Sequence, residues 1–162
     1  MVAAHPPTPG FLVWRLSMKW RAAVDRAVGH LGMTHAQYSL LASLFGMEQS
    51  GHTPSQRELA DQTGLDPIYV SKLARALERS GLITRSGDPT DSRAVRLELT
   101  DDGRTTVRSA IGVVHELLDE LTQPLGGYRG AGTRRLVDDL HALLAAPDPT
   151  PRRPPTPTRR KT

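Results

Sequence analysis

Apolar residues recur every three or four positions along much of this chain, which is the spacing of amphipathic helices. One such stripe runs through residues 11–31 and consists of Val13, Leu16, Trp20, Val24, Ala27, Val28 and Leu31. The spacing returns near the C-terminus at Val107, Ala110, Val114, Leu117 and Leu121, and then at Leu136, Leu140, Leu143 and Leu144. The pattern predicts a first helix over about 11–31 and two closing helices within about 104–145, with these side chains pointing inward.

Capping signals divide the middle of the chain into three more helices. Thr34 and Ser55 are each followed three residues later by Gln or Glu, which is the capping-box pattern of a helix start. Asp66 precedes Pro67, and proline suits the first helical position because no amide hydrogen is needed there. Gly64 allows a sharp turn between the second and third of these helices. These two short helices therefore predict a helix-turn-helix.

A different pattern follows the third of these helices. Residues 95–99 alternate between apolar and polar side chains, as in a strand with one buried face. Just before them, DPTDSR at residues 88–93 gathers turn-forming and charged residues. A helix-turn-helix followed by a short ribbon with a charged tip has the order of a winged helix-turn-helix. We therefore expect a mostly α-helical fold with a two- or three-stranded antiparallel wing, its winged part spanning about residues 34–100.

The helix expected over about residues 67–79 has two unlike faces. Its apolar stripe consists of Val70, Leu73, Ala74 and Leu77. The opposite face carries Ile68, Lys72, Arg75 and Arg79, flanked by Tyr69 and Ser71. In a winged helix-turn-helix such a helix enters the major groove of DNA, while the wing reaches the backbone or the minor groove. The alternative interpretation of the cationic face is an ordinary solvated helix surface.

This reasoning gives a set of candidate DNA contacts. They are Ser55, Gln56, Pro67, Ile68, Tyr69, Ser71, Lys72, Arg75, Arg79, Arg85, Asp91, Arg93 and Arg96. We expect Arg93 to reach a groove, with Asp91 orienting its guanidinium through a charge-assisted hydrogen bond. Arg85 and Arg96 are expected to meet phosphates.

Charge and composition limit the remaining possibilities. The net charge of +4 does not by itself indicate nucleic-acid binding, because the excess lies in residues 147–162 and residues 1–146 are balanced. The tail is rich in proline and lacks large apolar residues, so we expect it to be disordered, either as a solubilising end or as a non-specific phosphate contact.

One domain is expected over 1–146. The absence of cysteine excludes disulfides and thiol redox sensing, and no signal or membrane segment is evident, so a cytoplasmic location is expected.

LADQTGLDPIYVSKLARALERSGLITR at 59–85, followed by DSRAVRLELTDDGR at 91–104, resembles the core of the MarR (multiple antibiotic resistance regulator) family of bacterial transcription factors. The resemblance covers about residues 11–145, and its most specific part is the DxR at Asp91 and Arg93. It implies a homodimer whose first and last helices interlock on a pseudo-palindromic operator, and a repressor released by a small molecule. It implies no cofactor.

The resemblance also implies an effector pocket between the dimerisation and DNA-binding parts. Its candidate residues are Trp14, Met18, Trp20, Tyr38 and His115. The simplest alternative for the aromatic ones is helix–helix packing. Pro67 departs from the family pattern, in which a polar residue is common at the start of the recognition helix, and this leaves the first base contact open.

Three other functions are alternatives to DNA binding. An enzyme is disfavoured because the sequence has no HExxH, nucleophile elbow, phosphate-binding glycine loop or dinucleotide fingerprint. A metal sensor would need His30, His35 and His115 to meet in the fold, although their spacing is not that of paired ligands. A winged-helix module for protein contact would suit the balanced charge of residues 1–146. Titration with duplex DNA distinguishes these classes.

Overall fold

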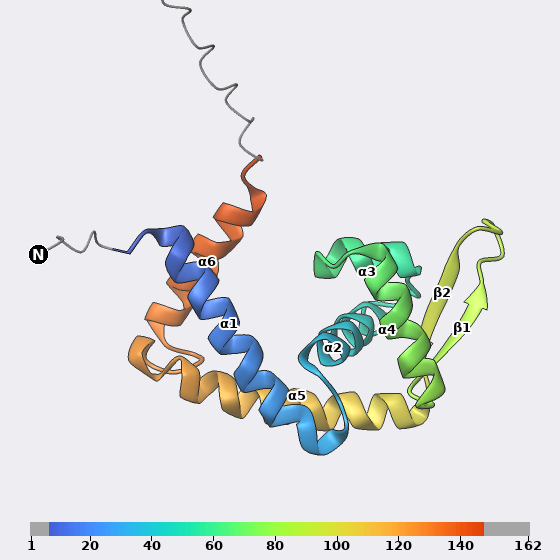
Figure 1. Cartoon of the computed structure of the whole chain (residues 1–162), viewed down its shortest axis with the longest axis horizontal. Helices are drawn as coiled ribbons and strands as arrows, with labels where there is room; N and C mark the ends of the chain where they lie inside the picture. The colour runs from blue at the N-terminus through green and yellow to red at the C-terminus, as the bar shows by residue number, and fades with distance from the viewer. Residues whose placement is uncertain (1–6, 148–162) are drawn as a thin grey trace, which may run out of the picture.

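The structure, a computed structural model, describes residues 7–147 as six α-helices, two short 3-10 turns and one two-stranded antiparallel sheet (Figure 1). In chain order the elements are α1 (Pro9–Val28), η1 (Gly29–Leu31), α2 (His35–Gln49), α3 (Gln56–Thr63), α4 (Pro67–Arg79), β1 (Ile83–Gly87), β2 (Val95–Leu99), α5 (Asp101–Leu121), η2 (Gln123–Leu125) and α6 (Ala131–Ala145). The expected fold class is confirmed. The expected disordered tail lies, apart from Pro147, outside the described residues.

The long helix α5 joins two parts of the molecule, as Figure 1 shows. At one end, α2, α3, α4 and the two strands pack together, and we call this part the winged lobe. At the other end, α1 packs on α5, and α6 follows the C-terminal end of α5; we call α1, α6 and the C-terminal half of α5 the helical arm. The chain order of α3, α4, β1 and β2 is that of a winged helix-turn-helix.

The described core lies mainly in the winged lobe and continues under the base of α1. Its most deeply buried side chains include Leu40, Leu41 and Leu44 of α2 together with Leu59, Val70, Leu77 and Leu97. Val24 and Val28 of α1 and Val107 of α5 belong to the same cluster. Burial of such residues is the main favourable term in folding, so the lobe has its own apolar centre.

The predicted helix starts are confirmed in detail. Thr34 and Ser55 both form complete capping boxes, in which the hydroxyl accepts an amide hydrogen and the N3 side chain accepts one in return. The Asp66 carboxylate accepts from the Ile68 and Tyr69 amides at 2.9 and 3.0 Å. Gly64 has φ of 67°, the left-handed conformation that closes α3 and permits the sharp turn into α4.

The wing is a two-stranded ribbon with an added bridge. Ile83 pairs with Leu99 and Gly87 pairs with Val95 at the two ends of the register. A single antiparallel bridge joins Ser55 to Arg96, so the third strand considered from the sequence is reduced here to one residue pair. This bridge ties the wing to the segment that leads into α3.

A close contact fixes the start of α5 against the turn between α4 and β1. Gly103 donates its amide to the Thr100 hydroxyl, which in turn donates to the Gly81 carbonyl. A Cβ atom on Gly103 would lie 1.9 Å from the Leu82 carbonyl oxygen. No side chain fits there without movement of the backbone, so glycine is required by packing.

The helical arm departs from the sequence prediction. Leu143 and Leu144 were expected to point inward, yet they are 68% and 83% exposed, and Leu140 is also exposed. Val13 and Leu16 of α1 are about half exposed. The reason is that α6 meets too little of the same chain to cover its apolar face.

Among residues 7–147, no helix combines the length and apolar composition needed to cross a bilayer.

Candidate nucleic-acid interface

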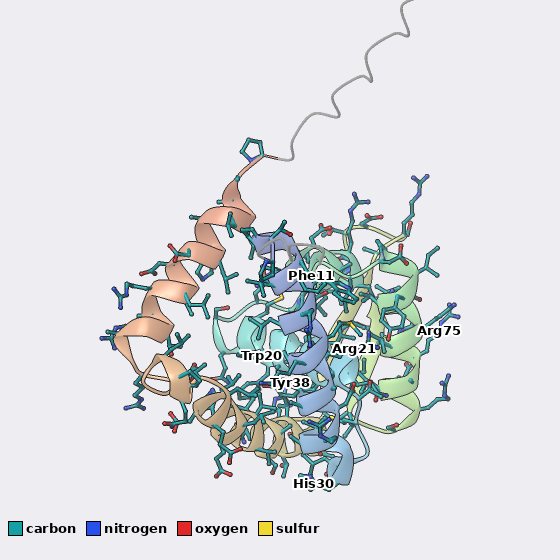
Figure 2. The ribbon with its side chains drawn as sticks, turned by 60° about the vertical axis from the view of Figure 1, so that its left-hand side comes forward. Phe11, Trp20, Arg21, His30, Tyr38 and Arg75 are labelled. Atoms are coloured by element: carbon teal, nitrogen blue, oxygen red, sulfur yellow. The ribbon has the colours of Figure 1, made fainter. Side chains whose placement is uncertain are left out.

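Helix α4 presents a cationic surface beside the wing. Lys72, Arg75 and Arg79 are exposed, and none of them takes part in an ion pair within residues 7–147. Arg75 projects away from the protein in Figure 2. Ile68 is 69% exposed and Tyr69 is also exposed, whereas Ser71 is half-buried. The expected recognition face is therefore open to a partner.

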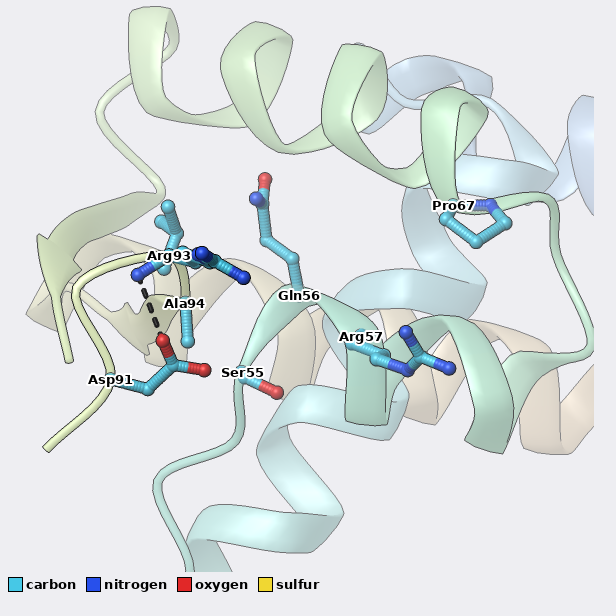
Figure 3. A pocket seen from close by; sticks show the side chains of 8 residues that line it. Ser55, Gln56, Arg57, Pro67, Asp91, Arg93 and Ala94 are labelled. Carbon is cyan, nitrogen blue, oxygen red and sulfur yellow. Dashed lines mark hydrogen bonds between the residues drawn. The ribbon is translucent and has the colours of Figure 1, made fainter.

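A groove of about 500 Å³ lies between the wing and the starts of α3 and α4 (Figure 3). It is lined by Ser55, Gln56, Arg57, Pro67, Asp91, Arg93, Ala94 and Val95. Residues from three separate segments of the sequence meet here, and five of them were candidate DNA contacts. Two exposed guanidinium groups, of Arg57 and Arg93, belong to its rim.

The expected role of Asp91 is wrong. Its carboxylate accepts the backbone amide of Arg93 at 2.9 Å, the dashed line in Figure 3, and no ion pair joins the two side chains. A carboxylate two residues ahead closes a tight turn on the main chain more readily than it reaches a long side chain. Asp91 therefore shapes the loop, and the Arg93 guanidinium is left exposed.

Arg85 and Arg96 are also corrected, because both are engaged within the protein. Arg85 lies 3.3 Å from the Glu78 carboxylate and its side chain is mostly buried. Arg96 lies 2.6 Å from the Asp88 carboxylate and also donates to the Thr53 carbonyl oxygen. Side chains held in this way are not free to meet phosphates, so both arginines support the wing from within.

Asp88 is held as an anion at the base of the wing tip. The Thr90 hydroxyl and the Thr90 amide, followed by the Asp91 amide and Arg96, hold the pKa of the Asp88 carboxyl well below its usual range. Its side chain is only 6% exposed. The carboxylate therefore stays ionised throughout the neutral pH range.

Two adjoining cavities lie at the junction of the helical arm and the winged lobe. The first, of about 390 Å³, is lined mainly by apolar residues of α1, α5 and α6, including Trp20, Leu118 and Leu136, and by Tyr128 from the loop before α6. The second, of about 320 Å³, lies between α1, α2 and the start of α4. The two cavities share Ser17, Arg21 and His35. Arg21 and Trp20 are labelled on α1 in Figure 2.

The structure brings together only part of the expected effector pocket. Trp20 lines the first cavity and Met18 lines the second. Trp14 is 60% exposed beside Phe11 and lines neither, and Tyr38 is half-buried against the core. His115 lines neither cavity, but its ring packs on Tyr128, with 5.4 Å between ring centroids.

Burial perturbs two groups near these cavities. It raises the pKa of Tyr38, with a further contribution from Tyr128. It lowers the pKa of His35; Arg21 acts in the same direction, and the Asp25 carboxylate opposes both. The Asp25 carboxylate also accepts the His35 backbone amide at 2.6 Å, which ties α1 to the start of α2.

The model of the MarR family matches residues 33–95, from the loop before α2 to the start of β2. An uncharacterized HTH-type transcriptional regulator, YdcH, of Bacillus subtilis is 36% identical over 110 residues, which cover 68% of this chain and 75% of that protein. The chain belongs to the MarR family. The organic hydroperoxide resistance transcriptional regulator of Bacillus subtilis is 26% identical over 134 residues, covering 83% of this MarR chain and 85% of that protein.

Solved MarR structures have the same fold. The transcriptional repressor CouR bound to a 23-mer DNA duplex is 30% identical, with a TM-score of 0.66, covering 85% of this chain and 90% of that one. The MepR–DNA complex of S. aureus is 24% identical, with a TM-score of 0.75 over 86% of this chain and 97% of that one, which shows the fold alone. The likeness extends beyond the residues that the family model matches.

The sequence analysis did not predict that Arg57 lines the groove between the wing and the starts of α3 and α4. The available signal was its place in the first turn of α3, because a cation is unfavourable at the positive end of a helix dipole unless something else compensates. The metal-sensor alternative finds no support, since no three His, Asp or Glu side chains in residues 7–147 gather with metal-ligand spacing. His30 instead bonds the Ala27 carbonyl oxygen through Nδ1 at 2.8 Å.

Proposed function

We propose that this MarR protein is a homodimeric transcriptional regulator that binds a pseudo-palindromic DNA operator. The observation that carries the proposal is the joint exposure of the cationic face of α4 and of Arg93 on the wing, without internal ion-pair partners among the described residues. Arg side chains recognise base edges and phosphates, so they explain both affinity and register. CouR and MepR, whose folds this chain shares, were solved with DNA.

The groove between wing and helices suits one strand of the DNA backbone. Arg57 and Arg93 supply positive charge along its rim, which attracts phosphates. We assign the major-groove contacts to Ser71, Lys72, Arg75 and Arg79, with Ile68 and Tyr69 offering apolar contact. Ser55, Gln56 and Pro67 border the same groove. Arg93 is assigned to the neighbouring minor groove or backbone.

A second copy of the chain is proposed to cover the helical arm. Phe11, Leu12, Val13, Trp14 and Leu16 of α1 are exposed, as are Leu140, Leu143 and Leu144 of α6. An apolar surface of this kind normally marks an interface. Two-fold pairing through both terminal helices would place two copies of α4 on the same side of the dimer. This geometry favours inverted half-sites.

The junction cavities are proposed as the effector site of a repressor. An apolar cavity beside a polar one that contains Arg21 and His35 would suit an aromatic or phenolic small molecule. Ligand binding there would change the position of the helical arm relative to the winged lobe. Through this coupling between the two sites, the ligand would weaken DNA binding. Having no cysteine, the chain cannot sense peroxides through a thiol.

Three further proposals follow from the regulatory role. Residues 1–146 act as one domain, which the continuous core from α1 to α5 supports. The protein acts in the cytoplasm, where it meets DNA. It is a regulator without a catalytic reaction of its own.

The test is selection of duplexes from a random-sequence pool by the intact protein, followed by titration of a selected duplex and an unrelated one. We expect enrichment of an inverted repeat and at least about a thousandfold preference for it. Enrichment of no sequence, with weak binding that disappears in moderate salt, would instead favour a winged-helix module for protein contact.

A further inference from the structure

The tip of the wing is folded around Asp88. One carboxylate oxygen accepts three hydrogen bonds: from the Thr90 amide at 2.7 Å, the Thr90 hydroxyl at 2.6 Å and the Asp91 amide at 3.0 Å. The carboxylate is almost wholly buried although it lies in a surface loop. The tip therefore has a defined shape that depends on one acidic side chain.

Arg96 connects this tip to the helix-turn-helix. Its Nε donates to the second Asp88 oxygen at 2.6 Å, and its Nη1 donates to the Thr53 carbonyl oxygen. Thr53 and Pro54 lead into α3, and Leu97 donates its amide to the Pro54 carbonyl oxygen at 3.0 Å. One guanidinium group thus joins the wing tip, strand β2 and the start of the helix-turn-helix. We call Asp88, Arg96 and Thr53 the wing clamp.

We propose that Asp88 and Arg96 are positioning residues for DNA binding, which set the place of Arg93 relative to α3 and α4 without touching DNA themselves. The inference rests on the proposed DNA-binding function. Residues 89–93 are exposed and contribute nothing to the apolar core, so polar contacts are what fix the tip. DNA must meet α4 and the wing together, and a tip already fixed in place loses less conformational freedom when it docks.

The positioning role of Asp88 predicts the opposite change in DNA affinity from the one that charge alone predicts. Replacing a carboxylate near DNA by a neutral amide should strengthen binding, because repulsion of the phosphates is removed. Asp88→Asn should instead weaken binding to the selected duplex about tenfold, since the amide cannot accept from Arg96 as the carboxylate does. Glu98→Gln is the matched control: it removes the same charge from an exposed position on β2, and we expect no weakening.

Arg96 provides a second contrast. Arg96→Lys keeps the positive charge, so a phosphate contact would largely survive the change. A lysine cannot bond Asp88 and Thr53 together through a planar fork, so the positioning role predicts a loss of about tenfold, close to that of Arg96→Ala. The salt dependence of binding should be the same for Arg96→Lys and Arg96→Ala, because both variants lose the same positioning of Arg93.

The decisive experiment is a double-mutant cycle on the selected duplex, with Arg93→Ala as the second change. If Asp88 and Arg96 act through Arg93, then Asp88→Asn and Arg96→Lys should cost nothing further once Arg93 is alanine. Hydrogen exchange of the amides of residues 88–94 in the free protein should be faster in both clamp variants. Thermal unfolding midpoints within about 4 °C of the parent would exclude loss of the fold as the cause.

Several results would overturn the proposal while leaving DNA binding intact. These are additive losses with Arg93→Ala, tighter binding by Asp88→Asn, or full retention of affinity by Arg96→Lys with a shallower salt slope for Arg96→Ala. If the parent protein selects no duplex at all, the DNA-binding proposal itself fails and the positioning role falls with it. The two failures are therefore distinguishable.

Discussion

The winged lobe and the helical arm differ in how far they bury their apolar side chains. In the lobe, Leu41, Leu59 and Leu97 are fully buried within one chain. In the arm, Trp14, Leu143 and Leu144 face solvent although they belong to equally regular helices. Both regions satisfy the same helical periodicity, so the difference lies in what covers each apolar face. The lobe is complete as a single chain, whereas the arm needs a partner.

The largest expected effect is loss of the dimer contact of the helical arm, with the fold of the winged lobe unchanged. The double change Leu143→Glu and Leu144→Glu places charges in the proposed dimer contact, and the dimer should dissociate at least about a hundredfold more readily. Both side chains are exposed in the single chain, so helicity should persist. Sedimentation equilibrium measures the effect. Ala142→Glu, on the opposite face of α6, is the control, and equal dissociation by both variants would count against this interface.

The next effect falls on the start of α5, where this helix packs on the winged lobe. Gly103→Ala forces a methyl group against the Leu82 carbonyl oxygen and should lower the free energy of unfolding by about 1–3 kcal/mol or more, as overpacking does. Gly112→Ala lies in the same helix, where the new methyl group would meet nothing within 4 Å beyond the backbone of its own helix, so it should be neutral or stabilising by about 0.5–1 kcal/mol. Urea unfolding compares them. Similar losses in both would show that the contact at Leu82 is unimportant.

A third change sharpens the functional side of the comparison. Arg75→Ala removes an exposed guanidinium from α4 and should cost about 1–3 kcal/mol of binding to the selected duplex. The dimer and its stability should not change, because the side chain contributes to neither. Fluorescence anisotropy on selected and random duplexes measures the cost. An equal loss of affinity for both duplexes would show that Arg75 contacts phosphates and not base edges.

The smallest effect concerns pH at the boundary of the two regions. Burial lowers the pKa of His35 in the folded protein below its usual value of 6.5, so the unfolded chain binds the extra proton more readily. Stability should therefore fall as pH decreases below about 6.5, and level off below the folded-state pKa. His35→Asn should remove this slope in urea unfolding. An unchanged slope in His35→Asn would contradict the assignment.

The sequence predicted most of the fold because local signals are strong. The capping residues Thr34, Ser55 and Asp66 each satisfy backbone amides within their own helix turn, so a short stretch of sequence is enough to place them. The alternation before Thr100 likewise contains its own evidence for a strand. The exposed leucines of α6 could not be placed, because periodicity reports that a face is apolar without reporting which chain covers it.

The candidate site was predicted less completely, for a related reason. The exposed cations of α4 follow from helical geometry alone. Arg96 was expected to meet DNA because its partners, Asp88 and Thr53, come together only in the folded wing. The same holds for Arg57, which joins Arg93 across a groove between distant segments. Charge can be read from a sequence, but whether that charge is already paired depends on tertiary structure.

The central claim is that two copies of this chain, joined through their arms, present two winged lobes to one DNA duplex. Hydroxyl-radical footprinting of the intact protein on its selected duplex tests this claim directly. We predict two protected segments of an inverted repeat with centres about 10 bp apart, protected together as protein concentration rises. Protection of one asymmetric segment of about 6 bp, at a stoichiometry of one chain per duplex, would contradict it.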